Sequence, residues 1–142
     1  MSKGYVAKTL RDLIALRARR RCGYCLTQEA VVGTPMQVEH IIPESLGGPT
    51  EAHNLWLACA LCNAHKGDRI VALDPDLGDV VRLFNPRTQR WAEHFSWSAA
   101  GDRILGRTPT GRATAVALNL NRPSLIIARL AWVSAGWHPP VE

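Results

Sequence analysis

The sequence predicts an α+β fold whose first half is braced by a metal site. Three observations lead to this prediction. All four cysteines occur as two C-x-x-C pairs, at Cys22/Cys25 and Cys59/Cys62. From the first pair to the second, the chain has the pattern of a strand, a loop and a helix. The second half has turn signals between short strand-like segments and ends in two helix-like segments.

In the first half, residues 9–21 are expected to form a helix, because apolar residues recur on one face with arginines toward the other. Residues 36–41 alternate like a strand, and Pro43 ends it. Residues 43–50 contain two prolines and two adjacent glycines, which predict a loop. A second helix is expected over residues 51–66, where it stops before a glycine.

In the second half, a polar turn and three short strands are expected at residues 74–79, 80–84, 91–97 and 103–105. Two helices are expected at residues 108–120 and 123–136, because each begins with a proline in its first turn. We expect Ile126, Leu130 and Val133 to form the apolar face of the last helix. The prediction is therefore short strands followed by two C-terminal helices.

Composition favours a single globular domain outside the membrane. The chain has 142 residues, of which 46% are hydrophobic and 20% are charged, as in globular proteins. No apolar run approaches the roughly 18 residues that a membrane span requires, and the start has no apolar signal region. We therefore expect the protein in the cytoplasm, where cysteine pairs are more often metal ligands or redox groups than disulfides.

The positive charge is concentrated in the N-terminal segment. The whole chain has a net charge of +5, but residues 1–21 alone carry +6. Such a cluster is suited to neutralising phosphates, although a solvated helix face is a common alternative. The residues predicted to contact nucleic acid are Arg17, Arg19, Arg20, Arg21 and Lys66. For Lys66, the alternative is that it only complements the C-terminus of its helix.

The paired spacing of the cysteines predicts one structural zinc site. Four thiolates in two C-x-x-C turns can surround zinc as a closed tetrahedron. A redox pair requires only one C-x-x-C, and four buried free thiols are the alternative to zinc. The acidic residue and histidine between the two pairs also favour zinc over a redox role.

Residues between the two pairs are suited to phosphodiester hydrolysis, which requires an activated water and charge stabilisation at phosphorus. His40 is a candidate general base, because histidine accepts protons near neutral pH. The oxygen atoms of Glu39 and Asn63 are suited to a hard divalent ion such as Mg²⁺ or Mn²⁺. Adjacent strand residues point to opposite faces, so Glu39 and His40 require a bend or a backbone carbonyl to act together.

The combined pattern resembles the HNH endonuclease family, also called ββα-metal or His-Me finger nucleases. The resemblance covers residues 22–67 and rests on the motifs in their order. These are C-x-x-C, Glu39-His40, Pro43, Gly47-Gly48, Asn54-Leu55 and C-x-x-C-Asn-x-x-Lys. The resemblance implies a ββα-metal core braced by a four-cysteine zinc site and a metal-dependent nuclease acting on DNA.

The resemblance also implies a role for each matching residue. His40 matches the general base, and Asn54 matches the asparagine that fixes the loop and helps to orient that base. Glu39 matches an acidic residue, more often aspartate, that binds the catalytic ion. Asn63 matches the last metal ligand, more often histidine, and its oxygen favours magnesium or manganese over softer metals. His65 is a rival ligand, but it points about 200° away from Asn63 on a helix.

Two functions follow from these patterns. The first is a metal-dependent HNH endonuclease that hydrolyses phosphodiester bonds in DNA, and the alternative is a non-cleaving, zinc-stabilised nucleic-acid-binding module. Glu39, His40 and Asn63 favour the nuclease, because a binding module has no use for them. His40 as an ordinary interior histidine and Asn54 as a simple helix cap remain the alternatives for those two residues.

Three segments are expected along the chain. They are a basic N-terminal helix at residues 1–21, the nuclease core with its zinc site at 22–67, and an α+β extension at 68–142 that packs on the core. The extension resembles the tail of a group of small bacterial HNH proteins in residues 82–86, 94–97 and 108–112. Its expected role is to complete the hydrophobic core, with an enlarged nucleic-acid surface as the alternative.

Overall fold

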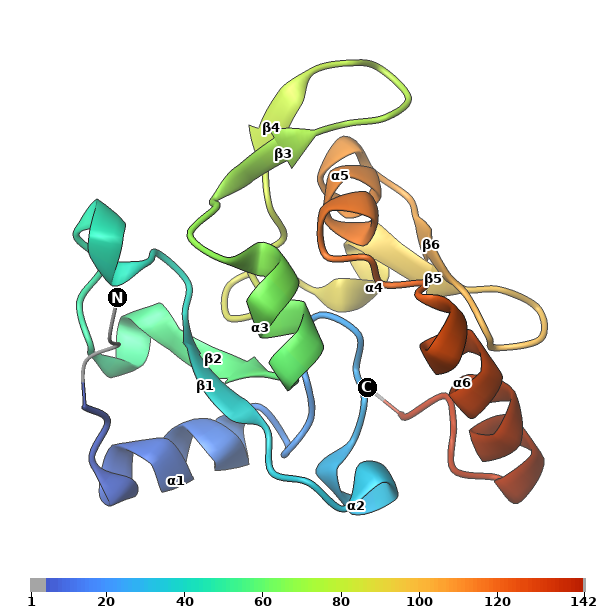
Figure 1. Cartoon of the computed structure of the whole chain (residues 1–142), viewed down its shortest axis with the longest axis horizontal. Helices are drawn as coiled ribbons and strands as arrows, with labels where there is room; N and C mark the ends of the chain where they lie inside the picture. Colours follow the sequence, from blue (N-terminus) through green and yellow to red (C-terminus); the bar gives the residue numbers. More distant parts are fainter. Residues whose placement is uncertain (1–4, 142) are drawn as a thin grey trace. The chain divides into compact units, whose positions relative to one another are not determined.

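The computed structural model describes residues 5–141 and divides them into two compact units (Figure 1). The first unit comprises the chain up to Ile70 together with Asn85–Thr88, and the second comprises Val71–Phe84 and the chain from Gln89 onward. The predicted α+β fold with a cysteine-braced core is confirmed. The packing of residues 68–142 on the core as one domain stays a prediction.

The first unit is built on a two-stranded antiparallel hairpin followed by a helix. Strand β1 (Gln37–His40) pairs with β2 (Leu55–Ala58), and His40 lies opposite Leu55. Helix α3 (Ala60–Lys66) follows β2 and contacts β1. The loop between the strands contains two single 3-10 turns, η1 (Glu44–Leu46) and η2 (Ala52–Asn54). The hairpin and α3 together form a ββα unit.

The predicted helix over residues 51–66 is wrong in its first half, which contains η2 and β2. The reason is tertiary pairing. Leu55 and Leu57 are buried on one side of the strand, and the main chain of this segment forms its hydrogen bonds with β1 instead of within a helix. Only α3, beginning after Cys59, is helical.

The N-terminal helix is shorter than expected. Helix α1 (Lys8–Arg17) packs on β1 and β2 through its buried residues Ile14 and Ala15, whereas Leu16 of the predicted apolar face is exposed. Arg19 and Arg20 follow with positive φ angles of 57° and 52°, which end the helix. A short helical turn, α2 (Glu29–Val32), lies between the first cysteine pair and β1.

The second unit contains two hairpins and two longer helices. The hairpins are β3 (Val71–Leu73) with β4 (Val80–Arg82), and β5 (Phe95–Trp97) with β6 (Ile104–Gly106). Helix α5 (Pro109–Ala117) contacts β3, β4 and β6. The predicted strand over residues 91–97 is a strand only in its second half, because a helical turn, α4 (Trp91–His94), precedes β5.

Aromatic packing and one ion pair stabilise this unit. The rings of Phe84 and Phe95 pack edge to face with centroids 5.2 Å apart. Arg112 forms a bidentate pair with Asp74, with distances of 3.0 and 2.9 Å. The hydrogen bonds from Arg112 lower the pKa of the Asp74 carboxyl to about 2. Helix α5 is thereby tied to the turn between β3 and β4.

The last helix buries an arginine instead of the predicted apolar face. In α6 (Pro123–Ala135), Leu125 and Arg129 are buried, whereas Leu130 and Val133 are exposed. Arg129 donates hydrogen bonds to the main-chain oxygens of Leu120 and Asp102, so its charge is solvated by the chain itself. Among the described residues, no helix has the length and apolar character of a membrane span.

Candidate functional site

The four cysteines come together in one cluster. Their sulfur atoms all lie within 4.8 Å of one another, and Cys25 and Cys59 are 3.7 Å apart. A tetrahedral zinc with Zn–S bonds of about 2.3 Å separates its sulfurs by about 3.8 Å, so the cluster fits zinc. Burial raises the pKa of the Cys22 thiol, and a bound cation is what would stabilise its thiolate.

Local geometry brings the two pairs together. The main-chain N–H of Gly23 donates to the Leu57 oxygen at 2.9 Å, which joins the first pair to β2. Gly23 is required there, because an added Cβ would lie 2.5 Å from the Trp56 ring and 2.6 Å from Pro86. Cys59 is the N-cap of α3, and its sulfur accepts the N–H of Cys62 at 3.4 Å. The hairpin and α3 therefore hold the two cysteine pairs next to each other.

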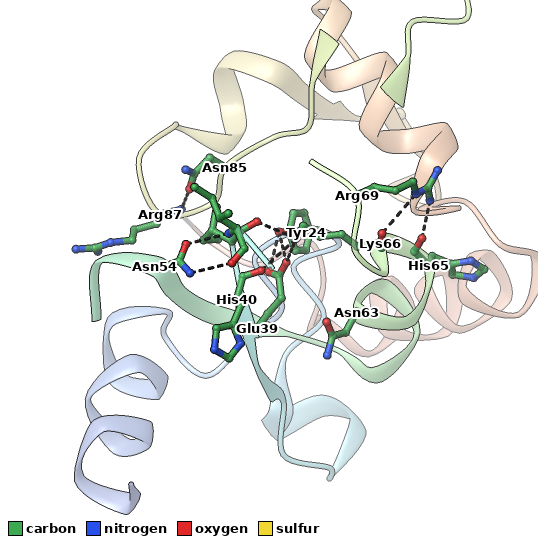
Figure 2. A network of polar contacts seen from close by, with 12 residues as sticks. Tyr24, Glu39, His40, Asn54, Asn63, His65, Lys66, Arg69, Asn85 and Arg87 are labelled. Atoms are coloured by element: carbon green, nitrogen blue, oxygen red, sulfur yellow. Dashed lines mark hydrogen bonds and ion pairs between the residues drawn. The ribbon is translucent and has the colours of Figure 1, made fainter. Parts of the chain in front are cut away.

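A buried polar triad lies behind the hairpin (Figure 2). The hydroxyl of Tyr24 lies 2.9 and 2.7 Å from the two carboxylate oxygens of Glu39, and the Lys66 ammonium lies 2.7 Å from one of them. Glu39 and Lys66 are each only 2% exposed. Burial, reinforced by the Glu39 charge, raises the pKa of Tyr24 well above its usual value. The triad links the first cysteine pair, β1 and α3.

The triad corrects two predictions. Lys66 was expected to contact phosphate, but its three ammonium donors face Glu39 and the main-chain oxygens of His40 and Ile41, at 3.2 and 3.0 Å. A buried lysine satisfied in this way has no donor left for a phosphate. Glu39 was expected to bind a catalytic ion, but its carboxylate is paired with Lys66 and points into the core.

His40 lies at the end of β1, where its ring contacts the loop that follows. Its Nε2 atom is 2.9 Å from Thr50 Oγ1, and the Thr50 hydroxyl donates to Glu44 Oε1 at 3.1 Å. His40 is only 5% exposed, yet it borders a groove of about 490 Å³. Tyr5, Arg11 and other residues of the N-terminal segment and β1 also line this groove. The imidazole therefore lies at the edge of this groove, with its Nδ1 atom buried.

Asn54 fixes the loop through main-chain contacts. Its side chain accepts the N–H of Ile42 and donates to the oxygens of Ile42 and Pro49, each at 2.9 Å. At Gly48 the loop approaches so closely that an added Cβ would lie 1.7 Å from the Ile42 oxygen. In this structure Asn54 holds the loop, whereas Thr50 and Glu44 contact the His40 ring.

Asn63 lies next to β1 through its contact with Gln37, which lines the same groove as His40. Its amide nitrogen donates to Gln37 Oε1 at 2.8 Å, and Gln37 and Glu39 share one face of the strand by alternation. Figure 2 shows His65 on the far side of α3 from Asn63. Among residues 5–141, only the four cysteines form a cluster of histidine, cysteine or acidic ligands able to hold a metal. Glu39 and Asn63 therefore do not make a complete ion site by themselves.

The predicted basic residues lie near the N-terminal helix. Arg17, Arg19 and Arg20 lie at or just after its end, and Arg21 is half-buried. Arg19 and Arg20 are exposed and border a hollow with Glu29, whose carboxylate is 4.0 Å from Arg20. Arg11, which had no assigned role, lies on the groove beside His40.

Several site residues were not anticipated from the sequence. Tyr24 stands between two cysteines, and only its pairing with a buried carboxylate gives it a role. Thr50 and Glu44 lie in a loop without periodicity, so no sequence signal pointed to them. Lys66 was predicted to contact nucleic acid, and only its burial was missed, although its spacing of four residues from Cys62 on the same helix face could have indicated it.

A comparison with known protein families matches residues 22–69 to the family model described as HNH endonuclease. The match covers the cysteine cluster, His40, Asn54 and Asn63, and it spans about a third of the chain. No curated protein and no solved structure matched the chain. The family match implies a nucleic acid as the substrate.

Proposed function

Because residues 22–69 form a domain of the HNH endonuclease family, we propose that this chain is a divalent-metal-dependent endonuclease that hydrolyses phosphodiester bonds in DNA. The observation that supports this proposal most is the placement of His40. It ends β1, borders a groove lined by Arg11 and receives a contact to Nε2 from Thr50.

In the proposed reaction, His40 is the general base. A water molecule gives its proton to the imidazole as its oxygen forms a bond to phosphorus. The bond from phosphorus to the leaving ester oxygen breaks, and that oxygen takes a proton from solvent. Arg11 lies on the same groove and supplies positive charge near the phosphate. Lys66 contributes indirectly, because it fixes the main chain of His40 and Ile41.

The proposed catalytic ion is Mg²⁺ or Mn²⁺, which would supply charge stabilisation at the phosphate. We propose the amide oxygen of Asn63 as a protein ligand, and we do not retain Glu39, because its carboxylate is paired with Lys66. Mg²⁺ keeps several waters and takes phosphate oxygens from its substrate. An incomplete protein site is therefore compatible with an ion that arrives together with DNA.

One observation favours the alternative of a non-cleaving, zinc-stabilised nucleic-acid-binding module. The Glu39–Lys66 ion pair removes a carboxylate that a hard cation would use. The placement of His40 on the groove weighs against this alternative. Zinc binding by four thiolates is consistent with either function and with a reducing cytoplasm, where we propose that the protein acts.

Metal dependence tests the proposed function. Supercoiled plasmid is incubated with the zinc-loaded chain in Mg²⁺, in Mn²⁺ and in EDTA, after it is verified that EDTA leaves the zinc content unchanged. We expect nicked or linear plasmid only with added metal. Asn63→Ala should lose cleavage and regain part of it at high Mg²⁺ or Mn²⁺, and the matched variant His65→Ala should change little. Retarded but uncut plasmid would support the binding module instead.

DNA binding is expected to weaken steeply with salt, because the N-terminal segment carries the positive charge. Each neutralised phosphate contributes about 0.9 to the slope of log affinity against log salt on duplex DNA. Replacing Arg19, Arg20 and Arg21 together by glutamine should flatten this slope. A second triple variant, at Arg82, Arg90 and Arg103, removes the same charge elsewhere. If only the second variant flattens the slope, the contact surface lies in the second unit.

A further inference from the structure

The loop after β1 places the Thr50 hydroxyl next to the His40 ring and the Glu44 carboxylate next to that hydroxyl. Nε2 of His40 is 2.9 Å from Thr50 Oγ1, and the same oxygen donates to Glu44 Oε1 at 3.1 Å. The direct distance from Nε2 to Glu44 Oε1 is 3.6 Å, so Thr50 bridges the two groups. These contacts are distinct from those of Asn54, which are with the main chain of the loop.

The direction of these bonds fixes the proton on the imidazole. A carboxylate only accepts hydrogen bonds, so the single hydroxyl proton of Thr50 goes to Glu44. The Thr50 oxygen must then accept from His40, which requires the proton to be on Nε2. In a neutral imidazole the other nitrogen, Nδ1, then carries the lone pair. A general base needs that lone pair to take a proton from water. Because Nδ1 is buried, this role requires that water reaches it from the groove when substrate is bound.

The loop geometry keeps Thr50 and Glu44 in place. Glu44 lies in the η1 turn, and Thr50 lies at the far end of the loop. Asn54 binds the main chain at Ile42 and at Pro49, on either side of the segment that carries Glu44. The close packing of Gly48 against Ile42 restrains the loop further. Asn54 therefore affects His40 through the two residues that contact the ring.

We propose that Thr50 and Glu44 are positioning residues that hold His40 as the Nε2–H tautomer, so that Nδ1 is the atom that accepts the proton of water. This inference rests on the proposed nuclease function. When Nδ1 takes the proton, the ring becomes positively charged. The hydrogen bonds from His40 to Thr50 and from Thr50 to Glu44 then become stronger, because they interact with a charged group. The residues thus stabilise the reacting state more than the resting state.

The test compares variants that keep or remove the hydroxyl. Thr50→Val, nearly the same size, should lower kcat for plasmid cleavage by about 10- to 100-fold, as expected for loss of a hydrogen bond to a charged group. KM should stay near the wild-type value. Thr50→Ser restores the hydroxyl and should recover most of kcat. Glu44→Ala should resemble Thr50→Val, and Ser45→Ala, an exposed neighbour, is the matched control.

Long-range proton–nitrogen NMR spectra of the full zinc-loaded chain give a readout independent of activity. At a pH above the ordinary histidine range, wild type should show His40 as the Nε2–H tautomer, and Thr50→Val should show a mixture. Wild-type kcat in Thr50→Val, or an Nδ1–H tautomer in wild type, would overturn the proposal. If the wild type does not cut DNA in any metal, the nuclease function fails, and the tautomer alone decides whether Thr50 and Glu44 position His40.

Discussion

Cys59→Ser is expected to abolish zinc binding and the cooperative thermal unfolding of the first unit. The four sulfurs lie within 4.8 Å of one another and join the turn before β1 to the start of α3. Structural zinc contributes about 10–16 kcal/mol in small zinc domains, which matches or exceeds the roughly 5–15 kcal/mol stability of a whole domain. Loss of one ligand therefore leaves the first unit without its main constraint.

The measurement combines metal analysis with a thermal melt followed by circular dichroism. Wild type should contain about one zinc per chain, and Cys59→Ser should contain little. Leu61→Ser is a matched control, because it lies in the same turn of α3 with its side chain exposed and leaves every ligand in place. A metal-free wild type that keeps its cooperative melt and its activity would show that the cysteines are not a structural zinc site.

The zinc cluster and the order of motifs were predictable, because both depend on spacing along the chain. Two C-x-x-C pairs indicate four ligands whatever the fold between them. Strand β2 was not predictable in the same way. Leu55–Ala58 is a short apolar run, which does not distinguish a strand from a helix, and its assignment depends on pairing with β1.

The candidate site shows the same difference between features set by local sequence pattern and features set by tertiary contacts. His40 was predicted as the base from its motif, and its place beside a groove is consistent with that prediction. The partners of Glu39 and His40 depend on tertiary contacts. Glu39 faces Lys66 because β1 turns that side toward α3, and Thr50 meets His40 because the loop folds back. Such contacts between residues 10 to 27 positions apart leave no local pattern in the sequence.

His40→Ala is expected to lose nearly all DNA cleavage. Removal of a general base costs on the order of 10² to 10⁴ in rate, and no other described histidine borders the groove. Zinc content and DNA affinity should stay near wild type, because the cysteine ligands and the basic segment are unchanged. His40 is buried, so His40→Gln serves as a second variant that fills more of the space, and a thermal melt verifies the fold of both.

His53→Ala is the matched control, because His53 lies in the loop after β1 with its side chain exposed and should not affect catalysis. The most direct measurement is the ratio of plasmid-nicking rates of wild type and His40→Ala, in Mg²⁺ and at equal zinc content. An HNH nuclease with His40 as its base predicts a ratio of at least about 100. A ratio near one, with both proteins folded and cutting, would contradict it.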